Sequence, residues 1–122
     1  MELSFGFDAG IVTVRLGGLY SAADAKTALA AVLPEPRVAG VRGTLLDLRA
    51  SDAIETRTGE ELREWARYLG SMSECLGGRA AILVRTDLAF GLARMVAARI
   101  DDSVLAVKVA RDKAEALDWL QR

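Results

Sequence analysis

Hydrophobic and polar residues follow two different periods along this chain, and the changes of period mark its predicted elements. Ala80 to Val84 form an unbroken apolar run, which is typical of a strand covered on both faces. The polar residues Arg85–Asp87 follow, and a helix is expected from about Asp87 to Arg99, with an acid at its start and a base at its end. Strand, short loop and helix make half of a βαβ unit, so this stretch predicts an α/β fold.

The amino-terminal residues alternate with a period of two, which predicts a pair of strands. Leu3–Phe7 and Ile11–Leu16 are the two strands, and Asp8-Ala9-Gly10 connects them as a hairpin. Gly10 is expected to supply the positive φ that such a loop usually needs. The first strand should therefore be antiparallel and lie at a sheet edge. Because an exposed apolar edge strand is a liability for a monomer, a homodimer is a further expectation.

Helical spacing appears first after this hairpin. Ser21, with Asp24 three residues later, is close to a capping box. Apolar residues then recur at helical spacing, which predicts a helix from about Ala22 to Leu33. Pro34 and Pro36 are expected to stop it, because proline has no N–H and disfavours a helical residue before it.

The strongest helical signal lies in the middle of the chain. Thr44–Leu48 is predicted to be a strand, and the polar loop Arg49–Gly59 follows it. The next helix carries apolar side chains at i, i+3, i+4, i+7 and i+10. These side chains belong to Leu62, Trp65, Ala66, Leu69 and Met72. One stripe of this helix should pack on the sheet and leave a charged face in water.

The last part of the chain completes the pattern. Val104–Val109 is predicted to be the last strand, and Asp112 with Glu115 is expected to cap a final helix. The order is therefore ββαβαβαβα, a mixed five-stranded sheet with an antiparallel amino-terminal edge strand and about four helices. Spacing alone does not determine the order of the strands in the sheet.

Composition narrows the classes to which the protein can belong. The chain has 122 residues, which is enough for one domain over residues 1–122. Lys and Arg total 16 against 17 Asp and Glu, so the formal net charge of −1 creates no overall field that would attract nucleic acid. No apolar run approaches the roughly 20 residues of a membrane span, and no signal-peptide pattern is present. A cytoplasmic location is therefore expected.

Few residues are suited to catalysis or metal binding. Cys75 is the only cysteine and histidine is absent, which excludes an internal disulfide and the usual zinc ligand sets. The thiol has no histidine to activate it. Acid pairs such as Asp52 with Glu55 are more simply partners of a helix dipole, and the glycine-rich phosphate-binding patterns are missing. We therefore expect no enzyme activity, no catalytic residue, no cofactor and no metal.

Three stretches carry a resemblance to a bacterial family. They are Leu45–Arg49 (LLDLR), Asp87–Met95 (DLAFGLARM) and Arg111–Leu120 (RDKAEALDWL). In these motifs and in its element order the chain resembles the SpoIIAA-like family, which is related in fold to the STAS domain of anti-sigma-factor antagonists and to the lipid-binding SEC14 domain. The resemblance implies a small mixed sheet with helices packed on it.

The same resemblance implies a non-enzymatic binding or regulatory role. A protein partner is the leading expectation. The SEC14 relatives imply the alternative, a small carrier of an apolar, lipid-like ligand. At 122 residues there is little chain to form a lid over a cavity of the usual size, about 300–1,000 Å³, which ranks the carrier second.

One loop carries a candidate phosphorylation site. STAS antagonists are phosphorylated on a serine just before their second helix, and the corresponding loop here is Ile54–Gly59. Thr58 and Gly59 can be placed on the serine and glycine of that motif, although Thr replaces Ser and Arg57 is inserted. A phosphate on Thr58 would gain from the helix dipole. The simpler interpretation is that Thr58 is the N-cap and that Glu61 completes a capping box.

The loops at the carboxyl ends of the strands are the predicted binding surface, because ligands meet an open parallel sheet there. The candidate partner- or ligand-binding residues are Asp47, Ser51, Thr56, Thr58, Gly59, Thr86, Asp87, Phe90, Gly91 and Arg94. An ordinary solvated loop edge is the alternative.

Two features of the predicted helix after Asp87 have competing explanations. Phe90 and Arg94 are one turn apart, so they share a face that could hold an anion or an aromatic group, or they form a core ring with an arginine lying over it. Gly91 costs about 1 kcal/mol relative to alanine in a helix, so something should require its missing side chain. Close packing against a neighbouring strand explains it as well as a ligand does.

Overall fold

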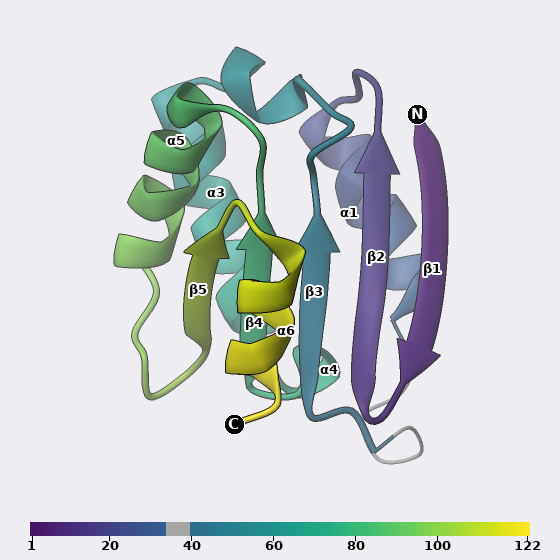
Figure 1. The fold of residues 1–122 in the computed structure, drawn as a ribbon. Coiled ribbons are helices and arrows are strands. Elements are labelled where there is room, and N and C mark those ends of the chain that lie inside the picture. Colours follow the sequence, from purple (N-terminus) through teal and green to yellow (C-terminus); the bar gives the residue numbers. More distant parts are fainter. Residues whose placement is uncertain (34–39) are drawn as a thin grey trace.

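The chain forms one mixed sheet in which sequence order and spatial order agree. A computed structural model describes residues 1–33 and 40–122, and Pro34 and Pro36 lie outside these residues. Within them the sheet has five strands in the order β1-β2-β3-β4-β5 (Figure 1). The strands are β1 (Glu2–Asp8), β2 (Ile11–Gly17), β3 (Gly43–Asp47), β4 (Arg79–Leu83) and β5 (Ala106–Ala110). β1 is antiparallel to β2 and the other neighbours are parallel, which confirms the predicted mixed sheet.

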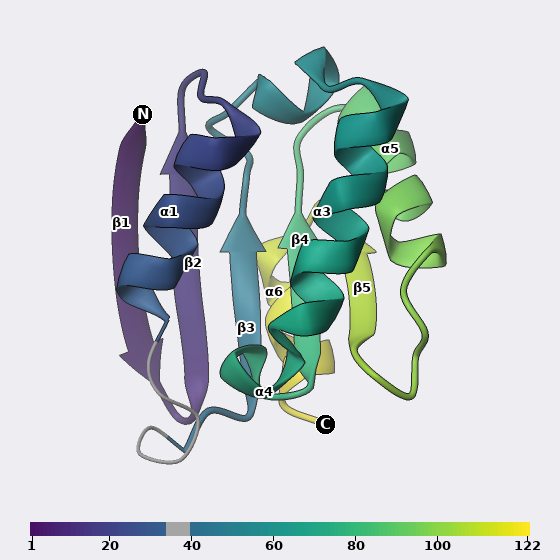
Figure 2. The same ribbon diagram turned by 180° about the vertical axis from the view of Figure 1, so that it is seen from behind.

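Helices cover the two faces of this sheet unequally. The helices are α1 (Ala22–Val32), α3 (Gly59–Ser71), the additional short α4 (Ser73–Leu76), α5 (Asp87–Ala98) and α6 (Lys113–Leu120), with the 3-10 turn η1 (Ala53–Thr56). In the described chain α1, α3 and α5 pack on one face, and α6 packs on the other against β3, β4 and β5 (Figures 1 and 2). No described helix is long and apolar enough to cross a membrane.

The predicted capping residues begin the first and the last helix. The Ser21 hydroxyl accepts a hydrogen bond from the backbone N–H of Asp24 at 3.1 Å. Asp112 accepts one from the second residue of α6 at 3.0 Å. Glu115 does not complete a box there, because its carboxylate lies 3.2 Å from Nζ of Lys108 on β5. That ion pair joins α6 to the edge of the sheet instead.

The core has two parts, one on each face of the sheet. The larger part lies between the sheet and α1, α3 and α5 and includes Val14 and Leu29. The smaller part lies under α6 and includes Leu120. A Cβ on Gly43 would come within 2.9 Å of the Leu120 side chain, so the glycine lets α6 approach β3 closely.

Two local details differ from the prediction. In the hairpin loop both residues have positive φ, 54° for Ala9 and 82° for Gly10, although only Gly10 was expected to. β5 begins at Ala106, not at Val104, because a turn occupies the intervening residues. The carbonyl of Asp101 accepts hydrogen bonds from the N–H groups of both Val104 and the next residue, at 2.9 and 3.0 Å.

β1 is the least covered strand of the sheet. All of its residues are exposed, as expected for an edge. Leu3, Phe5 and Phe7 remain 41%, 52% and 50% exposed. Their partners on β2 belong to the larger core, so these three side chains lie on the α1 face. The row of exposed apolar side chains that the sequence predicted is therefore present.

Candidate functional site

The two loops predicted to meet at the carboxyl ends of the strands are joined there. Nη2 of Arg85, after β4, lies 3.3 Å from Oδ1 of Asp52, after β3. The Thr86 hydroxyl donates a hydrogen bond to Oε1 of Glu55. Thr86 is also the N-cap of α5, where its hydroxyl accepts from the N–H of Ala89 at 3.1 Å. These contacts make residues 49–58 and 85–90 one surface, which we call the polar rim.

Two predicted binding residues are buried, Asp47 beneath the polar rim and Ser51 within it. Nε and Nη2 of Arg49 donate hydrogen bonds to the two carboxylate oxygens of Asp47, each at 3.0 Å. Burial alone would raise the pKa of Asp47, but the hydrogen bonds from Arg49, together with the positive charges of Arg49 and Arg15, outweigh it and lower that pKa. The Ser51 hydroxyl donates to the carbonyl of Gly18 at 2.6 Å. Contrary to the prediction, the rim does not present these two side chains to solvent, because both hold the chain where β3 ends.

Thr58 is the N-cap of α3 with a complete capping box, as predicted. Its hydroxyl accepts a hydrogen bond from the N–H of Glu61 at 3.1 Å, and its own N–H donates to Oε1 of Glu61 at 2.9 Å. That backbone hydrogen bond lowers the pKa of Glu61. Thr56 donates to the carbonyl of Ala53 at 2.7 Å. Thr56, Thr58 and Gly59 are all exposed, and phosphorylation of Thr58 stays a prediction.

Phe90 lies between two arginines at the start of α5. The half-buried ring packs on the larger core, and Cζ of Arg94 is 5.9 Å from its centroid. Cζ of Arg111 is nearer, at 4.6 Å, and Arg111 also forms an ion pair with Asp87. Helical spacing predicted the contact of Phe90 with Arg94. It could not predict Arg111, which follows β5 and reaches α5 only because β5 lies next to β4.

Gly91 is not explained by close packing within the chain. Apart from the adjacent residues and the backbone of α5 itself, no atom of the described chain lies within 4 Å of the position that a Cβ on Gly91 would take, so the proposed packing against a strand is wrong. Leu88 and Met95 lie on the same side of α5, three residues before and four after, and are 57% and 51% exposed. We call Leu88, Gly91 and Met95 the α5 face.

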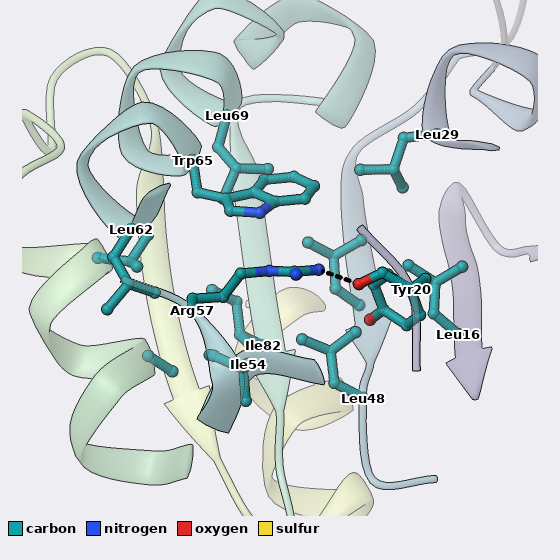
Figure 3. Close-up of a pocket in the computed structure, with 13 residues that line it drawn as sticks. Leu16, Tyr20, Leu29, Leu48, Ile54, Arg57, Leu62, Trp65, Leu69 and Ile82 are labelled. Carbon is teal, nitrogen blue, oxygen red and sulfur yellow. Dashed lines mark hydrogen bonds between the residues drawn. The ribbon is translucent and has the colours of Figure 1, made fainter. Parts of the chain in front are cut away.

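An apolar cavity of about 60 Å³ lies behind the polar rim, between the sheet and α1, α3 and α5 (Figure 3). Its lining comprises Leu16, Tyr20, Leu29, Leu46, Leu48, Ile54, Arg57, Leu62, Trp65, Leu69, Ile82, Ala93 and Val96. Arg57 reaches across the cavity, and its Nη2 donates a hydrogen bond to the carbonyl of Tyr20 at 2.7 Å. Burial raises the pKa of the Tyr20 hydroxyl, although Ser51 and Arg57 act in the opposite direction. Sequence reasoning missed this cavity, because its lining comes from elements far apart in the sequence, β2, α1, β3, α3, β4 and α5 among them.

Acidic side chains of the polar rim contact separate partners and do not form a cluster. Asp52 is paired with Arg85, and Glu55 accepts the hydrogen bond of Thr86. Within residues 1–33 and 40–122 no group of three His, Cys, Asp or Glu side chains is placed to hold a metal ion. Cys75 is a free, half-buried thiol.

Comparison with known proteins identifies the fold. Searches against protein-family models and against curated proteins found no match. Among solved structures, the chain is similar to an uncharacterized protein of the DUF3478 family with a SpoIIAA-like fold, from Shewanella loihica PV-4. The TM-score is 0.63 at 18% sequence identity, and the alignment covers 98% of this chain and 92% of that chain. This chain therefore has a SpoIIAA-like α/β fold, as its motifs and element order predicted.

Proposed function

We propose that this protein is a non-enzymatic binding module that docks a partner protein on the α5 face. The observation that supports this most is Gly91. Glycine inside a helix costs about 1 kcal/mol relative to alanine, and no neighbour in the described chain requires it here. If a partner approaches the helix closely at this position, the absence of a side chain on Gly91 makes room for it.

The surroundings of Gly91 indicate what such a partner presents. Leu88 and Met95 flank the gap and offer apolar surface, and methionine adapts its shape to what it contacts. Arg94 is exposed beside them, with its guanidinium over the Phe90 ring. The matching partner is an apolar segment that carries an acidic side chain, since an arginine at the rim of an interface selects the opposite charge.

Contacts in the polar rim hold the start of α5 in place. Thr86 caps the helix and is bound to Glu55, and Asp87 is paired with Arg111. A docking helix that is already ordered loses little conformational entropy on binding, which favours affinity. Thr58 belongs to the same rim, so its phosphorylation would add negative charge near the docking site.

Photo-crosslinking in cells tests this function. A photoreactive amino acid at Met95 is expected to give a discrete adduct with one protein, and the same amino acid at exposed Arg67 on α3 is expected to give none. In the Met95-labelled chain, Gly91→Met places a side chain in the gap, where its Cβ meets open space, and should remove the adduct. Equal adducts at the two positions, no adduct at Met95, or an adduct that Gly91→Met leaves intact would contradict the proposal.

The cavity favours a second candidate, a carrier of a small apolar ligand. Arg57 lies at an otherwise apolar lining, and no carboxylate of the described residues forms an ion pair with it. A ligand with an anionic end would match this cation. Known ligand cavities are commonly about 300–1,000 Å³, so the ligand has to displace Arg57 from the Tyr20 carbonyl.

Native mass spectrometry of freshly purified protein tests the carrier. A bound mass that Arg57→Glu removes and Arg67→Glu retains would support it. The bare chain mass in the wild type would contradict it.

A further inference from the structure

β1 forms its backbone hydrogen bonds to β2 with every second residue. The hairpin loop consists of Ala9 and Gly10, and both have positive φ, as in a type I′ turn. Such a loop closes on a hydrogen-bonded pair, which here is Asp8 with Ile11. Hydrogen-bonded and non-hydrogen-bonded pairs then alternate along the two strands without a bulge. Alternate residues of β1 therefore direct their N–H and C=O groups away from the sheet.

The outward-directed backbone groups belong to Leu3, Phe5 and Phe7. The same three residues carry the exposed apolar side chains on the α1 face. Free backbone groups and apolar side chains thus coincide along one edge, which is the condition for pairing with another strand.

We propose that β1 pairs antiparallel with β1 of a second copy of this chain, so that two sheets join into one across a twofold axis. The strand has no lysine, proline or bulge that would oppose such pairing. An antiparallel copy offers the same outward-directed donors and acceptors and the same apolar row on the same face, so each group meets its complement. This dimer does not depend on the α5 face.

Three symmetric registers place Phe5 opposite Leu3, Phe5 or Phe7 of the partner, and two of them are unfavourable. With Phe5 opposite the partner's Phe5, Glu2 faces the partner's Asp8 twice, and like charges directly opposite destabilise a sheet. With Phe5 opposite the partner's Phe7, Leu3 lies beside the hairpin loop and loses a strand partner.

The third register has no facing like charges, and Phe7 lies opposite the partner's Met1, an exposed apolar residue just before β1, in place of a loop. Leu3 lies opposite the partner's Phe5, so apolar side chains pair on the α1 face. On the other face Glu2 meets the partner's Gly6, and Ser4 meets the partner's Ser4 at the twofold axis. Ser4 bonds to β2 through its backbone, so the two Ser4 residues form a non-hydrogen-bonded pair with Cα atoms about 4.5 Å apart. A disulfide between cysteines is possible at that separation.

Sedimentation analysis of the full chain over a wide concentration range tests the dimer. The wild type should reach twice the chain mass of 13.1 kDa. Phe5→Lys should weaken dimerisation by about tenfold or more, since it places charge in the apolar row. Val104→Lys changes an equally exposed apolar residue far from β1 and should leave dimerisation unchanged. A monomer at every concentration, or equal weakening by the two variants, would overturn the proposal.

Cysteine cross-linking tests the register in a Cys75→Ser background. Ser4→Cys should form an intermolecular disulfide under mild oxidation, and Gly6→Cys should not. Both variants keep the fold, because Ser4 is exposed and a side chain at Gly6 meets open space. Cross-linking through Gly6→Cys in place of Ser4→Cys would overturn the proposed register. Absence of both disulfides would overturn it as well, because with Phe5 opposite the partner's Phe5 neither cysteine faces its own copy.

Discussion

The two edges of the sheet are built in opposite ways. At one edge, β5 has five residues, is half covered by α5 and α6, and carries Lys108 in an ion pair with Glu115. At the other edge, β1 has seven residues, all exposed, with a row of apolar side chains and no lysine. The chain covers both faces of β5 with its own helices and leaves β1 exposed. The difference identifies β1 as the edge available to another molecule.

The two proposed interactions use different parts of the molecule. Helix α5, which carries the α5 face, lies beside β5, at the opposite edge of the sheet from β1 (Figure 1). A dimer that joins the β1 edges therefore places its two α5 faces at opposite ends. Such a dimer would engage two partner molecules independently, or one repetitive partner with increased avidity.

Loss of the packing of α6 beside β5 should have the largest effect on stability. Leu120→Ala removes a fully buried side chain of α6 that packs over β3, and it should lower the free energy of unfolding by about 2–5 kcal/mol. Denaturant unfolding measures this. Leu19→Ala, at an exposed position, should change it by less than about 0.5 kcal/mol. A small loss for Leu120→Ala would show that α6 does not close this side.

A substitution at Asp47 tests the middle of the sheet without changing either edge strand. Asp47→Asn removes the charge that accepts three hydrogen bonds from Arg49, two from its guanidinium and one from its backbone N–H, and should cost about 1–3 kcal/mol near neutral pH. Oligomeric state should not change, since Asp47 lies on β3, away from β1. Chemical unfolding at neutral pH, together with sedimentation, measures the two quantities.

The same variant should show a pH dependence of defined sign. The folded-state pKa of Asp47 lies below its unfolded value, which is about 3.9. Its contribution is therefore complete above about pH 4 and is lost as the pH falls through the lower folded pKa. The difference in stability between the wild type and Asp47→Asn should shrink at acidic pH. A difference that grows as the pH falls would contradict the assignment.

A smaller effect of opposite sign is expected on α5. Gly91→Ala should raise the free energy of unfolding by up to about 1 kcal/mol, because alanine favours a helix and meets open space here. Thermal and denaturant unfolding measure it. A destabilised Gly91→Ala would mean that the glycine serves the fold after all.

The smallest effect on stability is expected at the β5 edge. Lys108→Ala removes an ion pair between two partly exposed side chains, which is worth about 0.2–1 kcal/mol. Because α5 and α6 still flank β5, the variant should not acquire a new dimer contact through this edge. Phe5→Lys weakens pairing through β1, so sedimentation of the double variant Phe5→Lys with Lys108→Ala reports on the β5 edge alone. A dimer of that double variant would show that the helices beside β5 do not protect this edge.

The sequence predicted most of the fold because its signals are local. The period of two in the hairpin, the stripe of the helix around Trp65 and the capping residues Ser21 and Thr58 all act within a few residues. Strand order is a tertiary property, so the spacing left it open. Motif resemblance and element order indicated the SpoIIAA-like fold, and structural similarity confirmed it.

The candidate site was predicted less completely. The meeting of the two loops followed from parallel strands, but burial of Asp47 and Ser51 depends on how the chain leaves β3. Arg111 reaches Phe90 from a distant segment, and Arg57 spans a cavity that local patterns do not encode. The open space at Gly91 also became visible only when neighbouring elements were in place.

Residue-resolved amide hydrogen exchange, measured at low and at high protein concentration, tests the open β1 edge most directly. Amides of Leu3, Phe5 and Phe7 should exchange quickly in the dilute protein and become protected as concentration rises. Amides of Ser4 and Gly6 should be protected in both conditions, because they bond to β2. Fast exchange at Leu3, Phe5 and Phe7 at every concentration would contradict the account.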